Sequence, residues 1–96
     1  MSLLKWLEDW FNQNCDGDWE HCEGIRIATL DNPGWFIQIS LIDTDIEGKY
    51  FKPLKIERSD FDWIHCNVED GIFKGFGGVR NLEEILDVFR VWALCE

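Results

Sequence analysis

Two histidine–cysteine pairs, His21-Cys22 and His65-Cys66, carry the side chains best suited to binding a metal ion. Structural zinc sites draw on closely spaced Cys-x-x-Cys or His-x-x-x-His ligands, and neither spacing occurs here. Neighbouring side chains on a strand point to opposite faces, so His65 and Cys66 do not readily share one ion. We therefore expect no metal and no cofactor. A metal-binding module built from His21, His65 and one cysteine stays open as an alternative.

The second chemical feature is Cys22, which is followed by Gly24 and then Arg26. This run resembles the active-site loop of the sulfurtransferases (rhodaneses), in which backbone N–H groups surround a cysteine sulfur and favour its thiolate. The resemblance implies a thiol-dependent sulfur transferase that uses Cys22 with Arg26. That fold, however, alternates strands and helices, and residues 24–30 have the composition of a strand. We favour a partly buried thiol at a strand entrance and keep the enzyme as an alternative.

Carboxylates gather in three polar segments of the chain. No nucleophile, glycine-rich phosphate loop or catalytic triad signature accompanies them, so the sequence indicates no enzyme. They form either a solvated acidic surface or an electrostatic face for a basic partner. The three groups are Asp16, Asp18, Glu20 and Glu23; Asp43, Asp45 and Glu47; and Glu57, Asp60 and Asp62.

Tryptophan is abundant, with six residues in this short chain, and most should lie in the core. Trp19 stands in an acidic segment, and Trp63 follows Asp60-Phe61-Asp62. A partly exposed tryptophan beside carboxylates is typical of a protein-binding hot spot. The expected partner-binding residues are Asp16, Asp18, Trp19, Glu20, Asp60, Asp62 and Trp63.

Length and composition indicate what kind of protein carries these residues. The chain has 96 residues, 46% hydrophobic and 15% aromatic, with a formal net charge of −10, which predicts one globular domain over residues 1–96. The negative charge argues against nucleic acid and anionic membranes as partners. The N-terminus lacks a signal-peptide pattern and no long apolar run occurs, so we expect a cytoplasmic protein with reduced cysteines.

Two helices are predicted at the ends of the chain. Residues 3–14 carry an apolar stripe at helical spacing, with Ser2 as the N-cap. Residues 82–94 carry a second stripe, and Asn81 with Glu84 fits a capping-box start.

Five strands are predicted between these helices. No helix separates them, so a parallel sheet is not expected. The sequence therefore predicts an α+β fold, an antiparallel five-stranded meander with the N- and C-terminal helices packed on one face. The strands span residues 24–30, 35–42, 50–57, 63–68 and 72–76, with a turn at 31–34 and an expected edge position or bulge at Pro53.

Several motifs together resemble the immunity protein 53 family, over nearly the whole chain. The resemblance implies a bacterial immunity protein, made beside a polymorphic toxin that it neutralises by binding, with no catalytic residues. The motifs are Leu4-Lys5-Trp6-Leu7-x-x-Trp10, Cys15-Asp16-Gly17-Asp18-Trp19-Glu20-His21, Gly24-Ile25-Arg26-Ile27-x-Thr29-Leu30-Asp31-Asn32-Pro33-Gly34-Trp35, Asp62-Trp63-Ile64-His65-Cys66 and Asn81-Leu82-Glu83-Glu84-Ile85-Leu86.

This resemblance agrees with the charge of the chain. Many such toxins are nucleases with basic substrate-binding surfaces. An acidic inhibitor is steered onto a basic target and can occupy the surface that nucleic acid would occupy. The expected partner is therefore a cognate protein toxin, bound through an acidic surface that contains tryptophan.

Overall fold

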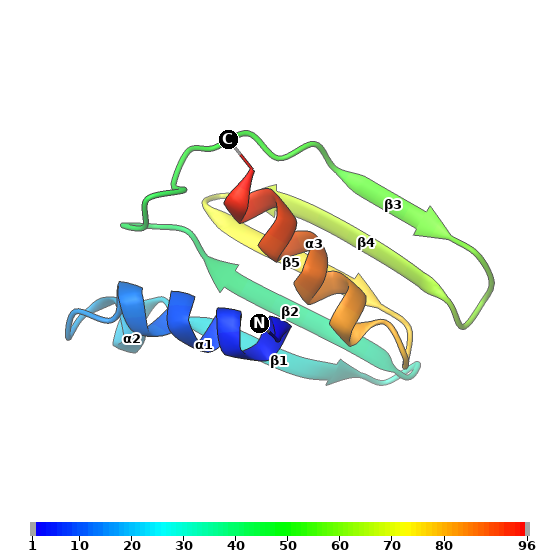
Figure 1. Cartoon of the computed structure of the whole chain (residues 1–96). Coiled ribbons are helices and arrows are strands. Elements are labelled where there is room, and N and C mark those ends of the chain that lie inside the picture. Colours follow the sequence, from blue (N-terminus) through cyan, green and yellow to red (C-terminus); the bar gives the residue numbers. More distant parts are fainter. Residues whose placement is uncertain (1, 96) are drawn as a thin grey trace.

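The computed structural model describes residues 2–95 and contains one five-stranded antiparallel sheet with helices on one side (Figure 1). The α+β class, the antiparallel sheet and the terminal helices agree with the sequence prediction. In chain order the elements are α1 (Leu3–Asn14), α2 (Trp19–Cys22), β1 (Ile25–Leu30), β2 (Gly34–Ser40), β3 (Leu54–Glu57), β4 (Trp63–Glu69), β5 (Ile72–Gly77) and α3 (Leu82–Leu94).

The strand order is β1-β2-β5-β4-β3, so the expected simple meander is wrong in one connection. The β1–β2 hairpin and the β3–β4–β5 meander are both present, but β2 pairs with β5 rather than with β3. The long connection 41–53 carries the chain from β2, the neighbour of one edge strand, to β3 at the opposite edge. The physical reason is burial, because β2 carries fully buried side chains and β3 is short and half exposed.

The core lies between the sheet and the two long helices. Ile37 and Ile39 of β2 and Phe73 of β5 are fully buried on the helix-covered face. Phe89 of α3 lies 5.1 Å between ring centroids from Phe73, and also 5.1 Å from Trp10 of α1. A single phenylalanine thus joins both helices to the sheet, which places the helices on the same face, as predicted.

The helix ends agree with the predicted boundaries, but only one cap has the expected bonds. The Ser2 hydroxyl accepts a hydrogen bond from the Lys5 N–H (3.1 Å) and caps α1. Asn81 precedes α3 but makes no side-chain capping bond. Its amide instead donates to Asp62 (2.9 Å) and to Glu84 (3.0 Å), because Asn81 is buried between the strands and the helix.

The strand limits differ most around Pro53. Residues 50–53 were predicted to open the third strand, but β3 begins at Leu54. Proline cannot donate to a ladder, so the strand forms only beyond it and lies at the sheet edge. The β4–β5 turn follows the predicted pattern, with positive φ at Asp70 (55°) and Gly71 (75°), a backbone that favours glycine.

No helix of the described chain covers the other face of the sheet (Figure 1). This open face carries Phe36 and Phe76, which pair across β2 and β5 and stack with ring centroids 4.8 Å apart. His65 of β4 lies opposite Phe76 in the register. Within residues 2–95, no helix combines the length and apolar character that crossing a membrane requires.

Candidate functional site

The residues expected to bind a partner fall into two separate regions. We call Asp16, Asp18 and Glu20 the acidic turn. They precede β1, whose first residue, Ile25, pairs with Ile39 near the end of β2. The segment 60–63 lies in the β3–β4 hairpin, at the opposite end and the opposite edge of the sheet (Figure 1). The structure therefore does not bring all seven residues into one continuous surface.

The acidic turn is held by its own carboxylates. Asp16 Oδ1 accepts the N–H groups of Asp18 and Trp19, both at 2.9 Å. The carboxylate of Glu20 accepts the N–H groups of Asp16 (2.9 Å) and Gly17 (2.8 Å). Hydrogen bonds from the Trp19 and Asp18 N–H groups hold the pKa of Asp16 below its usual value. Asp16 and Glu20 are thus ionised and structural, whereas the Asp18 side chain makes no capping bond and is exposed.

Trp19 does not occupy the exposed position that the sequence suggested. It begins the one-turn helix α2, and only 3% of its surface is exposed. Its ring packs against Trp10 (5.8 Å between centroids) and Phe11 (5.6 Å) of α1. Burial of the indole against α1 determines its position, although its sequence neighbours are acidic. The packed indole thereby holds the acidic turn against α1.

A polar network fixes the β3–β4 hairpin to the start of α3. Arg58 pairs with Asp62 (2.7 Å) and with Glu84 (2.5 Å), and Asn81 donates to both carboxylates. The hydrogen bond from Asn81, and then that from Arg58, lower the pKa of Asp62. Arg58 is the main cause of the lowered pKa of Glu84. Asp62 therefore positions the hairpin, and its charge is compensated within the protein.

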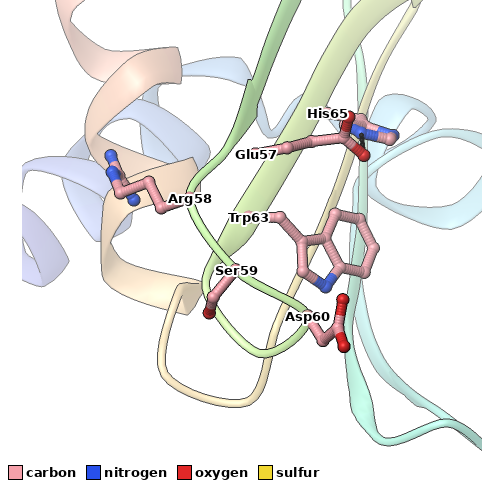
Figure 2. Close-up of a pocket in the computed structure, with 6 residues that line it drawn as sticks. All are labelled: Glu57, Arg58, Ser59, Asp60, Trp63 and His65. Atoms are coloured by element: carbon pink, nitrogen blue, oxygen red, sulfur yellow. Dashed lines mark ion pairs between the residues drawn. The ribbon is translucent and has the colours of Figure 1, made fainter.

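Asp60 and Trp63 lie beside a concave pocket of about 500 Å³, shown in Figure 2 with all six of its lining residues. The indole of Trp63 and the carboxylate of Asp60 lie side by side, and Arg58 points away toward α3. Glu57 Oε2 lies 3.4 Å from His65 Nε2, and the His65 ring is 5.0 Å from the Trp63 ring between centroids. We call Glu57, Asp60, Phe61, Trp63 and His65 the hairpin patch.

The hairpin patch suits a cationic side chain. Glu57 and Asp60 are exposed carboxylates that line the same pocket as the Trp63 ring. A lysine or arginine gains from the ring quadrupole and from charge-assisted hydrogen bonds to carboxylates in one place. The patch is therefore chemically suited to bind a basic protein surface.

Sequence reasoning missed three aromatic residues, one within this patch and two on the open face beside it. Phe61 is 78% exposed at the hairpin, and Phe36 with Phe76 forms the stack on the open face. The strand alternation already separated Phe36 from Ile37 and Ile39, but it did not indicate that the opposite face lacks a helix. The position of Phe61 between two aspartates was the available signal for an exposed aromatic side chain.

The geometry gives little support to the two alternatives, a sulfur transferase at Cys22 and a metal-binding module. Cys22 ends α2 and Arg26 lies on β1, and both line a shallow pocket with Glu23 and Ser40. The Ser40 hydroxyl donates to Glu23 (2.8 Å), so a carboxylate, rather than a ring of N–H groups, lies in this pocket. Among residues 2–95, no group of three or more histidine, cysteine, aspartate or glutamate side chains is placed to hold a metal ion.

Comparison with known proteins gives one finding. A family model described as Immunity protein 53 matches residues 4–94 of the chain. No curated protein and no solved structure matches the chain. The matched range begins at the second residue of α1 and includes every strand and α3, and so contains both the acidic turn and the hairpin patch.

Proposed function

The chain belongs to the immunity protein 53 family, and on this premise we propose that it binds and neutralises a cognate polymorphic toxin without catalysing a reaction. The observation that carries the proposal is the family match over residues 4–94. The proposed place of action is the cytoplasm of the cell that makes the toxin. An immunity protein acts by occupying its target, so its function depends on a surface rather than on a reactive group.

We propose that the hairpin patch and the adjoining open face of the sheet form the centre of this surface. Hot spots are enriched in tryptophan, tyrosine and arginine and cluster near the centre of an interface, in well-packed pockets that lose their water on binding. Trp63, Phe61 and the Phe36–Phe76 stack provide the aromatic area, and Asp60 provides a carboxylate that no ion pair in the described chain compensates. A basic side chain of the toxin would lie against Trp63, between Asp60 and Glu57.

The acidic turn has a second role in this proposal, which is to attract the toxin from a distance. Its ionised carboxylates contribute to a net charge of −10. Opposite charge accelerates association well above the rate of about 10⁵–10⁶ M⁻¹s⁻¹ for uncharged surfaces. A nuclease toxin with a basic substrate groove is the target that fits this charge best.

The test is binding to the toxin encoded by the adjacent reading frame. We expect the wild-type protein to co-purify with this toxin and to protect cells that express it. Asp60→Lys combined with Trp63→Ala should weaken binding about 30-fold or more, because hot-spot truncations cost about 2 kcal/mol or more. Failure of the wild-type protein to bind or protect would contradict the function.

A charge-matched control locates the surface. Asp9→Lys changes the charge by the same amount as Asp60→Lys, but Asp9 is exposed on α1, on the helix-covered side. It should leave affinity within about threefold of the wild type, since surface charges far from an interface act only through screened fields. An equal loss of toxin affinity in Asp9→Lys and in the Asp60→Lys, Trp63→Ala double variant would show that the hairpin patch is not the contact.

A further inference from the structure

β1 is an edge strand whose outer backbone groups can be identified from the ladder. Ser40 N–H donates to Gly24 O (3.0 Å), so residues 24 and 40 form a hydrogen-bonded pair of the β1–β2 ladder. Such pairs alternate with non-bonded pairs in an antiparallel ladder. Arg26 and Ala28 therefore bond inward to β2, and the N–H and C=O groups of Ile25, Ile27 and Thr29 point outward.

This outer edge is open. Four consecutive residues, Arg26 to Thr29, are exposed, and Ile27 is 44% exposed although its side chain lies on the helix face. Apart from the ladder with β2, no backbone hydrogen bond within residues 2–95 involves the strand Ile25–Leu30. Figure 1 shows β1 along the free margin of the sheet.

The two edges of the sheet differ in protection. β3 has four residues, follows Pro53 and presents Lys55 and Glu57, all of which discourage pairing with another strand. β1 has six residues, contains no proline and carries one charged side chain, that of Arg26. Proteins normally blunt such an edge, so an unprotected edge strand is typical of a place where another strand pairs.

We propose that β1 pairs with an extended strand of the toxin, which adds a sixth strand to the sheet. This inference rests on the proposed function and adds the mode of contact to it. The incoming strand bonds to the outward backbone groups of Ile25, Ile27 and Thr29. Backbone bonds give the contact its affinity, and side chains on the two faces give it specificity.

Charge favours a basic strand over a second copy of this chain. Glu20 and Glu23 precede β1 and Asp31 follows it, so carboxylates stand at both ends of the edge. In an antiparallel β1–β1 pair of two copies, the acidic start of one strand would lie beside Asp31 of the other, and facing like charges are destabilising. A toxin strand flanked by lysine or arginine meets opposite charge at both ends.

Amide hydrogen exchange tests the contact directly, with the toxin of the adjacent reading frame as the probe. In the free protein the N–H groups of Ile25, Ile27 and Thr29 should exchange rapidly, while those of Arg26 and Ala28 are already protected by β2. In the complex the first three should slow by about tenfold or more, since each gains a hydrogen bond. Complex formation without this alternating protection would overturn the inference and leave the proposed function intact.

A proline substitution gives an independent test. Ile27→Pro removes an outward N–H without removing a bond to β2, and should weaken toxin binding about tenfold or more. Ile27→Ala, which keeps the N–H and shortens the side chain, is the matched comparison and should weaken binding clearly less than Ile27→Pro does. Thr29→Pro repeats the test nearer the strand end if Ile27→Pro unfolds. Unchanged toxin binding in folded proline variants overturns the inference. It is also overturned if the outward N–H groups of β1 are protected from exchange in the free protein, and this protection grows with concentration as a dimer forms.

Discussion

Ile85 of α3 lies directly over Gly75 of β5, so close that a Cβ on Gly75 would overlap the isoleucine side chain. The neighbouring Gly77 has the same relationship, with the δ carbon of Ile85 at 2.8 Å from the position of its Cβ. Two glycines in one strand thus form the groove into which α3 fits. This contact sets how closely the helix approaches the sheet.

We predict that Gly75→Ala lowers the free energy of unfolding by about 1–3 kcal/mol, because the core has no room for the added methyl group. Urea denaturation followed by tryptophan fluorescence measures the effect. In the double variant Gly75→Ala with Ile85→Ala, the loss should be smaller than the sum of the single losses, since the shortened side chain vacates the space. A stability of Gly75→Ala within about 0.5 kcal/mol of wild type would contradict the prediction.

The Arg58 network makes stability depend on acid pH. The folded pKa values of Asp62 and Glu84 lie below their ordinary values, because Asn81 and Arg58 stabilise the charged forms. A lowered folded pKa contributes stability above the ordinary carboxyl pKa of about 4, and this stability is lost as the pH falls through the folded pKa. Arg58→Gln should therefore lower stability at neutral pH and flatten its decline on acidification.

The control for this network is Lys5→Gln, which breaks the exposed Lys5–Glu8 pair on α1 (3.1 Å). An exposed pair of this spacing contributes only about 0.2–0.5 kcal/mol, so the urea midpoint should shift little at any pH. Parallel pH curves for the wild type and Arg58→Gln would show that the network does not cause the acid sensitivity.

The acidic turn offers a matched pair of charge deletions. Asp16→Ala removes the carboxylate that accepts the Asp18 and Trp19 N–H groups, and should lower the free energy of unfolding, as the loss of a helix cap does. Asp18→Ala removes the same charge from a side chain without a capping bond and should be close to neutral. Thermal and urea denaturation of both variants compare them, and equal stabilities would contradict the assigned roles.

The cysteines should differ strongly in reactivity. Burial raises the pKa of the Cys66 thiol to about 12, so it stays protonated at neutral pH and reacts slowly. Cys22 and Cys95 are exposed. A thiol-specific chromogenic reagent should label Cys22 and Cys95 in the folded protein and Cys66 only after denaturation. Labelling of Cys66 at the rate of Cys22 would contradict this expectation.

Cys22 also separates the binding function from sulfur transfer. If the protein acts by binding, Cys22→Ser should bind and neutralise the toxin as the wild type does. The wild-type protein should then show no thiosulfate-to-cyanide sulfur transfer. Turnover that disappears in Cys22→Ser would favour the enzyme instead.

Local patterns predicted most of the elements. The apolar stripes of α1 and α3 and the alternation in β2 are short-range periodicities, and each follows from the face that an element buries. Strand order is different, because it depends on where the connection 41–53 leads. Burial of Ile46 and Phe51 in that connection ties it across the core. This long-range contact has no periodic signature.

The site was harder to predict than the fold. Asp16, Asp18 and Asp62 look alike in sequence, yet one caps a turn, one is exposed and one pairs with Arg58. Trp19 was misjudged because a one-turn helix is too short to show a period, while its ring packs on Trp10. Composition indicated an acidic, aromatic surface, but only the tertiary contacts distinguish structural carboxylates from free ones.

The pairing of β2 with β5 has a consequence for how the chain folds. Two parts of the sheet form over short turns, namely the β1–β2 hairpin and the β3–β4–β5 meander. Phe36 and Phe76, by contrast, pair only after the whole segment between them has been synthesised. Closing a long loop costs entropy before its contacts are gained, so non-local ladders form slowly. We expect the two local units to assemble early and to join last along β2 and β5. The time this step takes would set how soon after synthesis a new chain presents a complete sheet.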